Sequence, residues 1–112
     1  MYIIFTDLDN TLLDKKYSYI EAKEVLRKLK DANIPIIFCS AKTRREQEKI
    51  REKMGIYHPF IVEDGSAIYI PKGYFKKTKG QPINDYEIII LGTKIENIIK
   101  EIQNLQKKKD IR

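Results

Sequence analysis

The chain has 112 residues, of which 34% are charged and 42% hydrophobic, with a net charge of +6 and a single cysteine. This length fits one domain, and one cysteine excludes an internal disulfide. No apolar run approaches the roughly 20 residues of a transmembrane helix, and the apolar start from Tyr2 to Thr6 is too short for a signal peptide, so we expect a cytoplasmic protein.

The apolar start predicts a buried strand of a parallel sheet, and an acidic segment, 7–12 (DLDNTL), follows it directly. Ligands of such sheets bind at the carboxyl ends of the strands. Two carboxylates this close need a cation or a shared proton. Asp7 and Asp9 therefore predict a nucleophile and a proton donor with Mg²⁺ between them. The alternative is an Asx-type turn that caps the next helix.

A helix is predicted next, and it ends near Ala32. Ser18 and Glu21 have the spacing of a capping box at its start. Its apolar stripe consists of Ile20, Val25, Leu26 and Leu29.

A second buried strand, from Pro35 to Ser40, contains Cys39, which we expect to be a small core residue. The strand ends in the hydroxyl of Ser40, and the cations Lys42 and Arg44 follow. A hydroxyl and cations at a strand tip predict a phosphate site, since phosphoryl oxygens need fixed donors. Two alternatives remain: Ser40 is only a helix N-cap, and the cations are only solvated.

The middle of the chain continues the alternation of helix and strand that is typical of a parallel α/β sheet. A polar surface helix is predicted from Thr43 to Met54, and Gly55 ends it. After it we expect a strand at Pro59–Val62, a turn at Glu63–Gly65, a strand at Ala67–Ile70, and a loop or hairpin at Pro71–Asp85.

The last segment is a further strand–helix unit. Tyr86–Leu91 predicts a strand, and Thr93 with Glu96 forms a second capping box. The helix that follows has a regular apolar stripe, which consists of Ile95, Ile98, Ile99, Ile102 and Leu105. This stripe must be covered, either by the core of the same chain or in a homodimer.

The two strand tips together resemble the first two motifs of the haloacid dehalogenase-like phosphohydrolases. Segments 39–48 (CSAKTRREQE) and 59–75, which includes EDGSAI, resemble the mannosyl-3-phosphoglycerate phosphatase family. The resemblance extends from Met1 to about Leu105. This chain has Asp64 where that family usually has Asn.

The resemblance implies a partial Rossmann-like parallel sheet in residues 1–82, and the first strand–helix unit of a cap domain with a Lys-rich tail in 83–112. It implies a Mg²⁺-dependent phosphomonoester hydrolase in which Asp7 forms an aspartyl-phosphate, Asp9 is the acid and base, and both hold the metal. The implied phosphate and substrate ligands are Thr11, Ser40, Lys42, Arg44, Asp64, Gly65 and Ser66.

The family also has features that this chain lacks. Its later half contributes a Lys that pairs with the phosphate and an acidic loop that completes the metal site, and nothing after Asp85 matches either. We therefore expect a truncated enzyme with weak or no activity. Two alternatives stay open: a non-catalytic remnant that binds sugar phosphates, and a phospho-acceptor module of the receiver type.

The positive charge lies partly in the loop lysines 72–79 and partly in the tail 107–112. Nucleic acid is attracted to such patches, but no zinc spacing, aromatic RNA-binding motif or basic recognition helix accompanies them. We therefore expect the partner to be a phosphorylated small molecule of the sugar-phosphate or phosphoglycerate type, and not a nucleic acid or a membrane.

Overall fold

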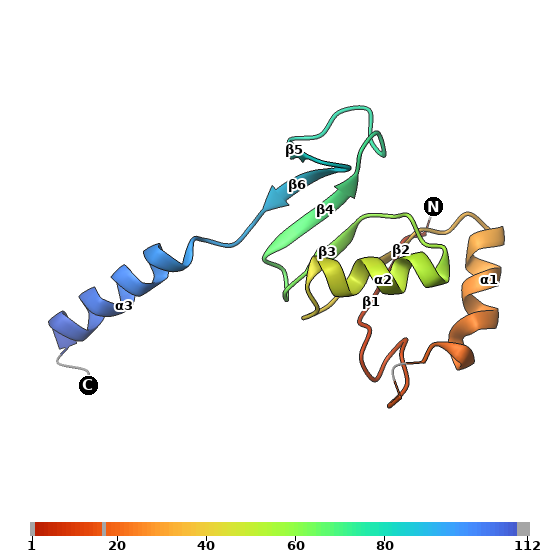
Figure 1. Ribbon diagram of the computed structural model, residues 1–112, viewed down its shortest axis with the longest axis horizontal. Coiled ribbons are helices and arrows are strands. Elements are labelled where there is room, and N and C mark those ends of the chain that lie inside the picture. The colour runs from red at the N-terminus through yellow and green to blue at the C-terminus, as the bar shows by residue number, and fades with distance from the viewer. Residues whose placement is uncertain (1, 17, 110–112) are drawn as a thin grey trace.

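The computed structural model describes residues 2–16 and 18–109 (Figure 1). Its elements in chain order are β1 (Ile4–Thr6), a 3₁₀ turn (Ile20–Ala22), α1 (Lys23–Asp31), β2 (Ile36–Cys39), α2 (Arg44–Met54), β3 (Phe60–Val62), β4 (Ala67–Pro71), β5 (Gln81–Ile83), β6 (Tyr86–Ile90) and α3 (Ile95–Lys109).

The strands form one sheet in the order β1-β2-β3-β4-β6-β5. The first three are parallel, and the pairs β3–β4, β4–β6 and β5–β6 are antiparallel. The α/β class is thus confirmed, and the sheet is mixed. The direction changes after β3 because only the turn 63–66 joins it to β4, and so short a connection permits only antiparallel pairing.

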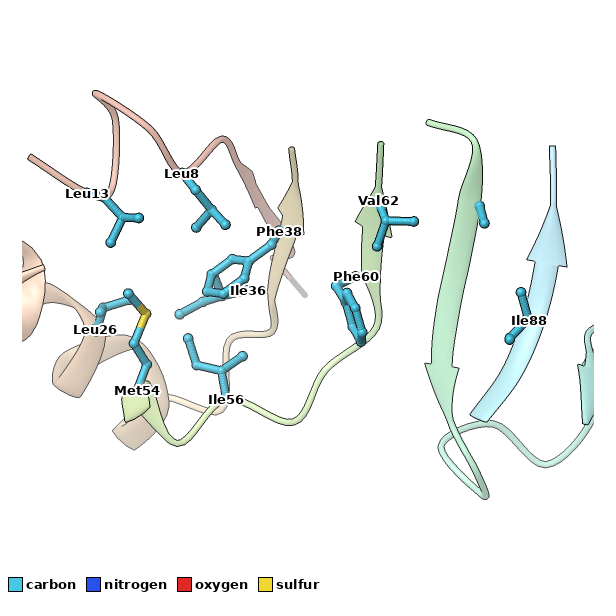
Figure 2. Packing of buried hydrophobic residues seen from close by; sticks show 11 residues of the cluster. Leu8, Leu13, Leu26, Ile36, Phe38, Met54, Ile56, Phe60, Val62 and Ile88 are labelled. Atoms are coloured by element: carbon cyan, nitrogen blue, oxygen red, sulfur yellow. The ribbon is translucent and has the colours of Figure 1, made fainter. Parts of the chain in front are cut away.

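The core lies where α1 and α2 pack against the first strands (Figure 2). Leu26 of α1 and Met54 of α2 meet Ile36 and Phe38 of β2 there. The prediction that β1 and all of β2 are buried is wrong. Phe5 is 65% exposed because β1 is the edge strand, and Cys39 is exposed at the end of β2.

The predicted start of the first helix is also wrong. The 3₁₀ turn precedes α1, whose N-cap position is Ala22 without a side-chain cap, and Ser18 Oγ instead accepts from Ile20 N at 3.3 Å. A 3₁₀ turn has three residues per turn, so the apolar stripe loses its register across it. Of the predicted stripe, Leu26 is buried and Leu29 half-buried, whereas Ile20 and Val25 are exposed.

The second helix agrees with the prediction at both ends. Thr43 is the N-cap of α2 and forms a capping box with Glu46, and Gly55 ends the helix in the left-handed region with φ of 68°. One side of α2 is nevertheless buried, since Gln47 and Arg51 are both covered. The Arg51 guanidinium lies 4.1 Å above the ring of Phe60, which also contacts Tyr69 and Tyr86.

The third helix extends away from the rest of the molecule (Figure 1). Its five stripe residues are 41–68% exposed, so in this structure the core of the same chain does not cover them. The strand before it, β6, pairs with β4 inside the main sheet. The boundary that we placed between 82 and 83 stays a prediction.

We expect His58 to make the stability of the fold depend on pH. Its Nδ1 lies 2.9 Å from the hydroxyl of Tyr74, and burial, with a smaller effect of Arg51, lowers the pKa of His58. The unfolded chain therefore binds a proton first as the pH falls below about 6.5. We expect the contribution of His58 to the free energy of unfolding to be complete above about pH 6.5. It should be lost as the pH falls through the pKa of folded His58.

Denaturant titrations at a series of pH values measure this effect. His58 is the only histidine, so His58→Gln should flatten the dependence near pH 6. An unchanged slope in that variant would assign the dependence to the carboxylates.

Candidate active site

The acidic segment and the loop of Ser40 lie at the carboxyl ends of two neighbouring strands. Thr6 of β1 pairs in register with Phe38 of β2. Asp7 and Ser40, which follow the last residues of the two strands, therefore lie at the same edge of the sheet. Leu8 and Leu13 are buried in the core, and Leu8 O accepts from Thr11 N at 3.3 Å and Leu13 N at 2.8 Å. The buried leucines thus fix a tight turn, with an aspartate on each side of Leu8.

The two aspartates have different surroundings. Asp7 is exposed, and its Oδ1 accepts from Leu8 N at 2.8 Å. Asp9 is half-buried, and its Oδ1 has no hydrogen-bond partner among the described residues although it is covered. That oxygen lies 3.3 Å from Lys42 Nζ, at ion-pair distance. Asp7 therefore faces solvent, whereas Asp9 has a cation beside it.

The side chain of Lys42 is largely buried. Its side chain is only 16% exposed, and its ammonium also lies 3.9 Å from Glu46 Oε2. The reading as a solvated charge is therefore wrong for Lys42. In this structure the protein's own carboxylates, Asp9 and more distantly Glu46, lie at ion-pair distance from it.

Ser40 is buried, and its Oγ accepts from Lys42 N at 3.1 Å. Accepting this bond leaves the hydroxyl hydrogen available for donation to a phosphoryl oxygen. The N-cap alternative for Ser40 is wrong, because Thr43 has that position.

The turn after β3 lies beside this loop. Asp64 N donates to Ser40 O at 3.0 Å, and Glu63 N donates to Lys42 O at 3.1 Å. Glu63, Asp64 and Gly65 have φ values of 47°, 54° and 98°, a run of left-handed residues that only glycine adopts without cost. Ser66 O accepts from Leu91 N and Gly92 N, which ties the turn to the end of β6.

Two of the predicted site residues point to other surroundings. Arg44 Nη1 binds Glu48 Oε1 at 2.7 Å, and this contact raises the pKa of Arg44. Arg44 lines a hollow of about 660 Å³ between α2 and the strands of Tyr69 and Tyr86. Thr11 lines a separate hollow of about 490 Å³.

The sequence reasoning missed Gln47, which is fully buried and donates to Lys42 O at 3.1 Å and to Ile61 O at 2.9 Å. A signal for its burial was present. Gln47, Ile50 and Met54 have the i, i+3, i+7 spacing of one helix face, so the glutamine stands in the apolar stripe of α2.

The described residues contain no group of three or more His, Cys, Asp and Glu side chains that could hold a metal ion. The oxygens of Asp7 and Asp9 are the hard ligands at the strand tip, and Mg²⁺ binds through one or two carboxylates and several waters. The donor set fits a loosely held Mg²⁺.

Residues 4–111 match the haloacid dehalogenase-like hydrolase family. The chain is 45% identical over 105 residues to a mannosyl-3-phosphoglycerate phosphatase of Pyrococcus horikoshii, covering 93% of this chain and 43% of that protein. It is 43% identical over 110 residues to a glucosyl-3-phosphoglycerate/mannosyl-3-phosphoglycerate phosphatase of Methanococcoides burtonii, covering 96% and 40%. The chain thus spans about two fifths of the length of these relatives.

Solved structures agree on the fold. A haloacid dehalogenase-like hydrolase from B. subtilis aligns with a TM-score of 0.65 at 21% identity, covering 98% of this chain and 34% of that one. A protein from Thermotoga maritima aligns with a TM-score of 0.63 at 19% identity, covering 96% and 36%.

Proposed function

The chain belongs to the haloacid dehalogenase-like hydrolase family, and we propose that it carries the nucleophilic part of a phosphomonoester hydrolase site. The observation that supports this most strongly is the exposed Asp7 beside Asp9, with the Lys42 ammonium 3.3 Å from Asp9 Oδ1. A nucleophile, a proton carrier and a cation are the groups that phosphoryl transfer through a covalent intermediate requires.

In the proposed reaction, a carboxylate oxygen of Asp7 forms a bond to phosphorus while the bond to the leaving oxygen breaks. Asp9 enters this step in its protonated form and donates the proton to that oxygen. Asp9 then takes a proton from a water that attacks the aspartyl-phosphate, which releases inorganic phosphate and restores Asp7. Ser40 donates to the transferring phosphoryl group, and Thr11 keeps the turn of the two acids in shape.

Asp7 and Asp9 are the residues that would hold Mg²⁺. When bound, the ion supplies positive charge that neutralises the phosphoryl oxygens. Lys42 supplies a positive charge of the protein's own beside Asp9.

For the substrate we propose a phosphorylated sugar acid of the mannosyl-3-phosphoglycerate type, the compound in the name of the relatives. The turn of Asp64, Gly65 and Ser66, together with Arg44, would contact its sugar or glycerate part. No helix among the described residues is long and apolar enough to cross a membrane. A place in the cytoplasm stays our prediction.

Steady-state release of phosphate tests the proposed function. With Mg²⁺ present, we expect slow release from mannosyl-3-phosphoglycerate and slower release from an aryl phosphate. Binding of the sugar phosphate without any release would favour the non-catalytic alternative. Equal rates with both substrates would argue against the proposed substrate class.

We expect Mg²⁺ to bind weakly, with a dissociation constant above about 10 μM, because the Asp7 carboxylate and the main-chain carbonyl of Asp9 are the only protein ligands that we expect for it. Isothermal titration calorimetry measures this constant. Tighter binding would mean that another acid completes the site, and Asp64→Asn would then identify or exclude the nearest acidic turn.

We also propose that the apolar stripe of α3 pairs with the same stripe of a second chain. Each exposed Ile or Leu forgoes roughly 1.5–3 kcal/mol of burial, so we expect sedimentation at micromolar concentration to show a dimer. The double variant Ile98→Glu/Ile102→Glu should be monomeric. A wild-type chain that sediments as a monomer, like that variant, would contradict the dimer.

A further inference from the structure

We propose that Gln47 is a positioning residue of the site: its buried amide fixes the main chain of Lys42 and thereby keeps the Lys42 ammonium on Asp9. The importance of this contact for turnover rests on the proposed function. The coupling of the three side chains does not, and it can be measured without substrate.

The orientation of the Gln47 amide is determined by its two partners. Nε2 donates to Lys42 O at 3.1 Å and to Ile61 O at 2.9 Å. Both partners are carbonyl oxygens, so only the nitrogen of the amide can face them. Oε1 is consequently left buried with no hydrogen-bond partner among the described residues.

The unsatisfied Oε1 makes glutamine unfavourable for stability at position 47. An unsatisfied buried acceptor destabilises the fold, and an apolar residue of similar size would avoid that cost. The two donated bonds are what the glutamine provides in return. These two hydrogen bonds come from the buried side of α2 and connect the loop after β2 with β3.

The main chain of Lys42 is held on both sides. Its N–H donates to Ser40 Oγ at 3.1 Å. Its carbonyl oxygen accepts from Gln47 Nε2 and from Glu63 N, both at 3.1 Å. The main-chain position of Lys42 is therefore fixed, and its side-chain Nζ lies 3.3 Å from Asp9 Oδ1.

Asp9 belongs to the turn after β1, and Gln47 belongs to the interior of α2. Lys42 connects the two. Loss of the Gln47 donors should therefore let the loop of Lys42 shift and release the ammonium from Asp9, although Gln47 itself does not contact Asp9.

Amine acetylation of the whole chain, read by mass spectrometry, tests this inference. A partly covered, ion-paired lysine is modified slowly, and Lys49, which is exposed on α2, is the internal reference. In Gln47→Met, which keeps the volume and removes the donors, we expect the Lys42-to-Lys49 ratio to rise several-fold. Asp9→Asn should raise the same ratio, because it removes the charge of the partner.

The matched control is Met54→Ala, which alters another buried residue of α2 with no contact to Lys42 among those described. It should destabilise the fold and leave the ratio at the wild-type value. A folded Gln47→Met chain with the wild-type ratio would overturn the proposal. If Gln47→Met does not fold, Gln47→Glu is read by the same criterion, since its carboxylate cannot donate to the two carbonyl oxygens.

This assay separates the two proposals. A raised ratio without any phosphate release would retain the positioning role and reject the function. An unchanged Lys42-to-Lys49 ratio in a chain that releases phosphate would reject the positioning role and retain the proposed function.

Discussion

Asp7→Asn is expected to abolish phosphate release and to leave the fold intact. An amide does not attack phosphorus as a carboxylate does, so the covalent step is lost. The fold should not change, because Asp7 is exposed and the one described hydrogen bond of its side chain, Oδ1 with Leu8 N, can be made by an amide oxygen. Asp9→Asn should reduce the rate about 10²-fold or more, the scale of a positioned proton donor.

Phosphate release and circular dichroism are compared for the wild type and the variants. The matched control is Asp31→Asn, which alters an exposed acid of α1 paired with Arg27 and should leave the rate unchanged. Turnover of Asp7→Asn within a few-fold of the wild type would remove Asp7 from the nucleophilic role.

Phe60→Ala should have the largest effect on stability, a loss of about 3–5 kcal/mol in the free energy of unfolding. Phe60 is fully buried in β3. Its ring stacks on Tyr69 at 5.4 Å between centroids and meets Tyr86 edge-on at 5.7 Å. The Arg51 guanidinium would also lose the ring beneath it. The substitution therefore leaves a cavity between the sheet and α2.

Denaturant titration of Phe60→Ala measures this loss. The control is Phe75→Ala in the exposed loop before β5, which should change the free energy of unfolding by no more than about 0.5 kcal/mol. Similar losses for both variants would mean that Phe60 is not the centre of this packing.

The parts of the fold that were predictable are those with a local cause. Thr43, Glu46 and Gly55 specify the ends of α2 by capping and left-handed geometry, and these signals act over a few residues. The place of Asp7 and Ser40 at neighbouring strand tips was also predictable, because parallel strands end at one edge of a sheet.

One of the errors concerns a feature that depends on distant parts of the chain. The exposure of Phe5 and Cys39 follows from which face the helices cover and from the place of β1 at the edge of the sheet. Apolar runs do not contain that information. The predicted start of α1 was wrong for a local reason: Ser18 Oγ accepts from Ile20 N, and a 3₁₀ turn replaces the capping box.

The site was predictable in composition and less so in its connections. Lys42 was expected at the site as a substrate ligand, and its contact with Asp9 depends on the packing of two loops that are far apart in sequence. The contact of Arg44 with Glu48 is an i, i+4 pair on one helix. That pair could have been read from the spacing.

The most direct measurement of the central claim is reductive trapping of the intermediate. The chain is mixed with Mg²⁺ and mannosyl-3-phosphoglycerate and quenched with borohydride, which reduces an acyl phosphate to an alcohol, and the peptides are sequenced by mass spectrometry. We predict that Asp7 alone is converted to homoserine, and that Asp7→Asn abolishes this conversion. Phosphate release without any conversion at Asp7 would contradict the account.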